Sequence, residues 1–122
     1  MSETERVSSD ERAREALGHV IENADQIARY VEGIDFEAFR AEAMRRDAIE
    51  RCLERIIEAC LRVGQERLNQ IVPGMLLHQV RGFGNRMRHE YDRINSEIVW
   101  QTATETIPAL REACAKAAGE RG

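Results

Sequence analysis

A short polar segment in the second half of the chain carries the residues best suited to chemistry. Residues 80–91 read VRGFGNRMRHEY, and another arginine follows at position 93. Histidine titrates near neutral pH, so it can take or give a proton in catalysis. Arginine can bind two phosphate oxygens at once through parallel N–H groups. One histidine among several arginines therefore indicates a site that handles a phosphate group.

The spacing within this segment predicts which side chains share a helical face. At about 100° per residue, His78, Gly82 and Asn85 all lie within about 40° of His89. We therefore expect His89 at a solvated surface or an interface and not in the core. The apolar residues fall on the opposite face, which we expect to be buried: Leu76, Val80, Phe83 and Met87.

Two glycines lie in the same predicted helix, and each costs about 1 kcal/mol relative to alanine in a helix interior. Gly82 lies on the histidine face, where it would let a ligand or a second backbone approach closely; a weak or irregular helix is the alternative. We expect this face to form the interface of a symmetric dimer, which a larger side chain at Gly82 would obstruct. Gly82 and Gly84 do not form a phosphate loop, because no third glycine follows them and no strand precedes them.

The composition predicts one all-α domain over residues 1–122. Of these residues 43% are hydrophobic, 5% aromatic and 33% charged, and only two are proline, which favours helices packed through aliphatic side chains. We expect an antiparallel bundle of four main helices plus a short one, with flexible tails at 1–7 and 119–122. The expected helices cover about 8–31, capped by Ser8 with Glu11, a short segment after Asp35, 43–68, 75–90, and a last helix from Asn95 or Ser96 with a kink at Pro108.

Charge and residue usage exclude several classes of function. The net charge is −4, whereas general DNA-binding proteins and membrane-surface proteins present broad basic faces. No apolar run approaches a membrane span and the N-terminus is too polar for a signal peptide, so a cytoplasmic protein is expected. The three histidines give no paired ligand spacing, so neither a metal nor another cofactor is expected. Cys52, Cys60 and Cys114 lack the C-x-x-C spacing and are expected to be buried free thiols.

The order of these features resembles the HepT-like toxins of the HEPN superfamily, and the resemblance covers nearly the whole chain. Besides the segment around His89, it rests on three further segments: Phe36 to Phe39, Ala48 to Ala59, and Glu97 to Trp100 with Pro108 and Leu110 beyond. The resemblance implies a HEPN-like helical bundle. It also implies a homodimer in which two motif helices face each other across a cleft.

The resemblance further implies the toxin half of a type VII toxin-antitoxin module, a metal-independent ribonuclease neutralised by an MNT-type nucleotidyltransferase antitoxin. Active members carry an arginine, a polar residue, three more residues, a histidine, any residue and a tyrosine. His89 matches the histidine, Asn85 the polar residue and Tyr91 the tyrosine. Tyr91 would be the hydroxyl that the antitoxin adenylates; an aromatic cap on the helix is the alternative. Gly84 stands where the arginine is expected.

The missing arginine matters because cleavage of RNA through its own 2′-hydroxyl needs both a base and a cation. His89 can act as the base, and Arg86, Arg81, Arg88 or the partner subunit would have to supply the cation, if it is supplied at all. Arg86, three residues from His89, is the best placed of them. Asn85 would orient the substrate. Arg81 and Arg88 would bind further phosphates of the RNA.

Two alternatives to an active enzyme remain open. One is a catalytically weakened HEPN module that keeps its partner and the RNA or nucleotide cleft without efficient cleavage, and the other is a plain helical interaction protein. If the missing arginine limits catalysis, Gly84→Arg should raise ribonuclease activity. If Arg86 replaces it, Gly84→Arg should change little. Position 84 lies about 140° from His89 on a regular helix, so an arginine there could miss the cleft.

Overall fold

The computed structural model describes residues 2–89 and 93–120, and these residues contain helices and no strands. The prediction of an all-α fold is therefore confirmed. None of the helices in these ranges is both long enough and apolar enough to cross a membrane. The helices are α1 (Glu3–Val31), α2 (Phe36–Ala41), α3 (Ala43–Val63), α4 (Gln65–Ile71), α5 (Leu77–His89), α6 (Arg93–Gln101), the π-helical turn η1 (Thr102–Thr106) and α7 (Ile107–Glu120).

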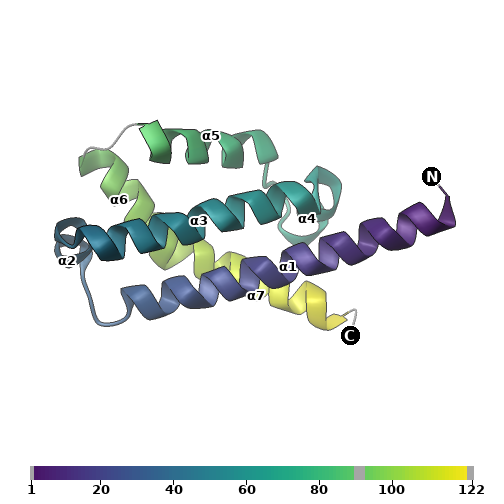
Figure 1. Ribbon diagram of the computed structural model, residues 1–122, viewed down its shortest axis with the longest axis horizontal. Helices are drawn as coiled ribbons and strands as arrows, with labels where there is room; N and C mark the ends of the chain where they lie inside the picture. The colour runs from purple at the N-terminus through teal and green to yellow at the C-terminus, as the bar shows by residue number, and fades with distance from the viewer. Residues whose placement is uncertain (1, 90–92, 121–122) are drawn as a thin grey trace.

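Three long helices form the body of the bundle. α1 and α3 lie side by side and run in opposite directions, and α7 packs against α1 (Figure 1). Their facing sides bury aliphatic residues such as Ile27, Ile49 and Leu53, because removal of apolar surface from water drives this packing. At the α2 end, Phe39 is fully buried and its ring lies 5.3 Å from that of Trp100 on α6, centroid to centroid. α5 packs on α3 (Figure 1).

The first helix begins at Glu3, and its cap is Ser2 and not Ser8. The Ser2 hydroxyl accepts a hydrogen bond from the Glu5 backbone N–H at 3.1 Å, and the Glu5 carboxylate accepts one from the Ser2 N–H at 3.4 Å. This is a complete capping box. The Ser8 hydroxyl instead accepts a hydrogen bond from the Arg12 guanidinium at 2.7 Å. Residues 3–7, expected to be a tail, are therefore part of the helix.

The helix expected over 43–68 is divided in two at Gly64. The backbone of Gly64 has φ 91° and ψ 155°, a conformation essentially confined to glycine, so α3 ends at Val63 and α4 starts anew. α4 is then held against α1 by Arg67. Its guanidinium pairs with the Asp10 carboxylate and donates to the Ser9 carbonyl oxygen at 3.1 Å.

We expect Gly64→Ala to lower the free energy of unfolding by about 1–3 kcal/mol, because any side chain is strained at this φ and ψ. Gly18→Ala is the matched control. Gly18 lies within α1, and a Cβ there meets no atom within 4 Å. That exchange should raise stability by about 1 kcal/mol, and urea denaturation would measure both variants. Equal stability of the two variants would contradict this account of the break between α3 and α4.

The last expected helix is one continuous helical stretch that is made of three elements, with an irregular turn just before Pro108. α6 begins at Arg93, and η1 is followed directly by α7. In η1 the turn is widened, since the Ile107 N–H donates to the Thr102 carbonyl oxygen five residues earlier. Pro108 has no N–H and cannot continue the regular α-helical pattern, which accounts for an irregular turn just before it. α7 extends to Glu120, so residues 119–120 are helical although a tail was expected there.

The three cysteines are buried and free, as predicted. Burial raises the pKa of Cys60 to about 12 and that of Cys114 to about 11. Burial also raises the pKa of Cys52, although neighbouring arginines oppose the shift. The thiols therefore stay protonated near neutral pH and serve as small core side chains, not as nucleophiles.

Candidate functional site

The segment with the candidate residues forms α5, which lies along α3 (Figure 1). One side chain of α4 fixes the start of α5. The Gln65 amide oxygen accepts a hydrogen bond from the Leu77 N–H at 2.9 Å, and its amide nitrogen donates to the Met75 carbonyl oxygen at 2.8 Å. Gln65 thus satisfies two backbone groups at the helix entrance.

The inner face of α5 contacts the helical body largely as the spacing predicts. Met87 is buried, while Val80 and Phe83 are half-buried and pack against the core. Leu76 was expected on this face, but 39% of its surface is exposed. The reason is that α5 begins only at Leu77, so Leu76 belongs to the connection before the helix and helical angles do not apply to it.

The outer face of α5 is open in the monomer. His78 and Asn85 are exposed, and so are the candidate cations Arg81 and Arg86. A Cβ at Gly82 would meet no atom within 4 Å, so a second molecule can reach the backbone there. The exposed outer face agrees with the prediction that this side of the helix is solvated or forms an interface.

The last residues of the motif are described only in part. α5 includes the backbone of Arg88 and His89, which places His89 one turn beyond Asn85 and three residues beyond Arg86. The side chains of Arg88 and His89, and all of Tyr91, lie outside the described residues. The structure therefore brings Asn85 and Arg86 onto the helical turn that leads to His89.

Arg86 also marks the junction between α5 and α6. It lines a shallow depression of about 10 Å³ together with Met87 of α5 and Asn95 and Ile98 of α6. Arg86 therefore lies where two helices meet, close to the end of α5. Residues 93–101, which resemble the HepT-like pattern at Glu97 to Trp100, thus pack beside the motif helix.

Gly84 is buried, although the resemblance noted in the sequence implies an arginine at this position. It precedes Met87 by three residues, so both positions lie on the inner face of α5. The side chain of an arginine introduced here would leave the backbone on the side of the helix that faces the core. The burial of Gly84 therefore agrees with the angular argument that an arginine at this position could miss the cleft.

We expect Gly84→Arg to lower the free energy of unfolding by about 2–4 kcal/mol, because it places a large charged side chain at a buried position. Gly119→Arg is the matched control at an exposed glycine of α7, where a Cβ also meets no atom within 4 Å. It should change the free energy of unfolding by less than about 0.5 kcal/mol. Urea denaturation of both variants would decide, and a Gly84→Arg protein as stable as Gly119→Arg would contradict the burial argument.

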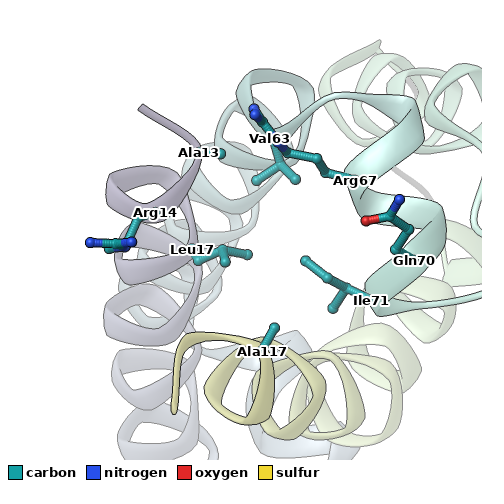
Figure 2. Close-up of a pocket in the computed structure, with 8 residues that line it drawn as sticks. All are labelled: Ala13, Arg14, Leu17, Val63, Arg67, Gln70, Ile71 and Ala117. Carbon is teal, nitrogen blue, oxygen red and sulfur yellow. The ribbon is translucent and has the colours of Figure 1, made fainter. Parts of the chain in front are cut away.

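A separate small cavity lies where α1, α4 and α7 meet (Figure 2). Leu17, Ile71 and Ala117 surround it, and Arg14 points away from it (Figure 2). Its volume of about 30 Å³ has the scale of a water molecule, which is too small for a substrate. Within the described part of the chain, no group of three or more His, Cys, Asp or Glu residues is placed to hold a metal ion.

Comparison with known proteins identifies the family. The model of the family described as Ribonuclease HepT-like matches residues 20–117. A candidate RNase of Caldanaerobacter subterraneus subsp. tengcongensis is 30% identical over 101 residues, which cover 81% of this chain and 88% of that protein. Two candidate RNases of Methanocaldococcus jannaschii are each 25% identical over 96 residues, or 79% of this chain and 78% and 82% of their own lengths. No solved structure matches the chain significantly.

The matched range runs from α1 into α7 and contains all of α5. The part of the chain that matches the family model therefore includes the helix that carries the candidate residues. The resemblance recognised in the sequence is confirmed: this chain belongs to the HepT-like ribonuclease family.

Proposed function

We propose that this protein is a ribonuclease toxin that cleaves RNA without a metal ion, in a cleft between the α5 helices of two copies. The observation that carries the proposal is the open outer face of α5. There Asn85 and Arg86 are exposed on the turn that leads to His89, in a chain of the HepT-like ribonuclease family. The core-facing side of the same helix packs against α3 and thereby fixes the positions of these exposed residues.

The chemistry would use the 2′-hydroxyl of the RNA as the nucleophile. The His89 imidazole takes the 2′-hydroxyl proton, and the oxygen attacks the adjacent phosphorus. The bond to the 5′-oxygen breaks, and this oxygen receives a proton. The products are a 2′,3′-cyclic phosphate and a 5′-hydroxyl. His89 thus acts first as a base, and its conjugate acid can supply the second proton.

The charge that develops on the phosphate would be stabilised by Arg86. Arginine can donate two parallel N–H groups to phosphate oxygens, and Arg86 lies one helical turn before His89. Asn85 would orient the phosphate, while Arg81 and Arg88 would hold neighbouring phosphates of the strand. This local positive charge lies within a protein of net charge −4, which favours a narrow RNA site over general nucleic-acid binding.

The proposed cleft needs two copies of the chain. A two-fold axis beside the outer face of α5 brings two sets of these residues together, and Gly82 permits close approach of the helices. The partner in the cell would be an MNT-type nucleotidyltransferase antitoxin that adenylates Tyr91. Added phosphate charge near the cleft would then repel RNA.

The test is cleavage of RNA by the purified protein in excess EDTA. We expect the rate to match that in untreated buffer and the new ends to be 2′,3′-cyclic phosphates, because the base and the cation are side chains of the protein. A metal-dependent nuclease in the same buffers controls for complete chelation. Dependence on a divalent ion, or products that end in a 3′-hydroxyl, would contradict the mechanism.

A second candidate is a weakened module that binds RNA without cutting it efficiently. The observation that favours it is Gly84, which lacks the family arginine and is buried. Such a protein would bind RNA with a salt-dependent affinity and release no cleaved product. The same EDTA assay, combined with a filter-binding measurement, separates this candidate from the enzyme.

A further inference from the structure

The inner side of α5 borders an apolar groove. Its floor is formed by α3, through residues such as Leu53 and Ile57, and one wall by Val80 and Phe83 of α5. The opposite wall comes from η1 and the start of α7, and the connection over residues 72–76 forms the rim. The volume is about 450 Å³, within the range of small-molecule sites.

The lining of this groove is chemically distinct from the rest of the molecule. None of the sixteen residues that line it is charged, although 33% of the chain is charged. A charged ligand would lose its hydration here without gaining a partner. The lining therefore selects an uncharged and mainly apolar occupant.

Two polar side chains interrupt the apolar lining at its exposed edge. Thr106 projects from η1 and Gln79 from α5, and both are exposed. The hydroxyl of Thr102, also in the lining, already donates to the Ile98 carbonyl oxygen at 2.8 Å. Thr106 and Gln79 are thus placed to bond a polar end of an otherwise apolar molecule.

The irregular turn η1 provides a second, independent observation. π-helical turns are rare and occur often at functional sites, where they change the direction of side chains. Here the turn supplies both Thr102 and Thr106 to the groove. The one π-helical turn in the described part of the chain therefore lies in the wall of this apolar groove.

The structure assigns this groove as a binding site for an uncharged, mainly apolar small molecule with one hydrogen-bonding end. An acyl chain or an aromatic ring that carries an amide or hydroxyl group has this chemistry. The assignment does not depend on ribonuclease activity. Because Val80 and Phe83 belong to the helix that carries Asn85 and Arg86 on its other side, an occupant would also hold α5 in place.

The experiment uses the uncharged fluorescent probe N-phenyl-1-naphthylamine and the full-length protein. We expect saturable binding of one probe per chain. Leu76→Glu places a charge at the exposed rim, and Thr106→Trp fills the opposite wall without adding charge. Each should weaken binding about tenfold or more. Met44→Glu introduces the same negative charge as Leu76→Glu, at a side chain that is 88% exposed and outside the groove. This variant should leave binding unchanged.

Hydrogen exchange gives a readout that does not rely on fluorescence. Probe binding should slow exchange of the amides in α5, and this slowing should disappear in Leu76→Glu but not in Met44→Glu. Non-saturable binding, or equal binding by all four proteins, would overturn the assignment. So would a wild-type dimer that binds the probe only after dilution to monomers and that Leu76→Glu dissociates, since the groove would then be an interface between copies.

Discussion

Replacing Arg86 with alanine is expected to reduce RNA cleavage about 10²–10³-fold, comparable to the loss of one donor from an oxyanion site. The physical reason is that Gly84, which stands where the resemblance to the HepT-like toxins implies an arginine, is buried and carries no charge. A cation at another position must then stabilise the negative charge that develops on the phosphate. Arg86 is exposed on the turn that precedes His89. Stability should change little, because Arg86 lies at the surface.

The matched control is Arg81→Ala, another exposed arginine on α5. It should raise KM with little effect on kcat, since its proposed contact is with a phosphate that does not react. Arg86→Lys should retain part of the rate, because lysine keeps the charge but loses the two parallel N–H groups. Equal kcat values for Arg86→Ala and the wild type would show that the cation comes from elsewhere.

Helical periodicity predicted the fold class and most helices, but not the helix boundaries. Ser2 and Ser8 both begin a Ser-x-x-Glu pattern, and only the structure shows that the first one caps α1. The spacing of apolar residues continues past Gly64 to the buried Leu68, so a prediction from periodicity alone treated α3 and α4 as one helix. The positive φ of Gly64 was the missing signal, and a glycine before a polar segment could have indicated it.

The same periodicity predicted which face of α5 would be buried, because helical angles depend only on spacing. Met87 faces inward and Asn85 outward, and the angular argument that an arginine at position 84 could miss the cleft is consistent with the burial of Gly84. Two features of the site escaped prediction. Gln65 lies on α4 but accepts a hydrogen bond from the first residue of α5. The apolar groove is lined by segments that lie far apart in the chain. Neither feature produces a local pattern in the sequence.

His89 carries the largest expected effect, since the mechanism has no other base on this turn of α5. General base catalysis contributes about 10²–10⁴-fold to a rate, so His89→Ala should lose a factor of this size. His78→Ala is the matched control. His78 is exposed on the same helix, but it lies at the first turn of α5, while His89 lies at the end.

The most direct test of the account is the initial rate of RNA cleavage in EDTA, measured for the wild type, His78→Ala and His89→Ala purified in the same way. Circular dichroism and sedimentation would establish that all three have the same fold and assembly. The account predicts cleavage by the wild type and His78→Ala, and a rate about 10²–10⁴-fold lower for His89→Ala. Equal rates for the wild type and His89→Ala, or a folded dimeric wild type that does not cleave RNA, would contradict it.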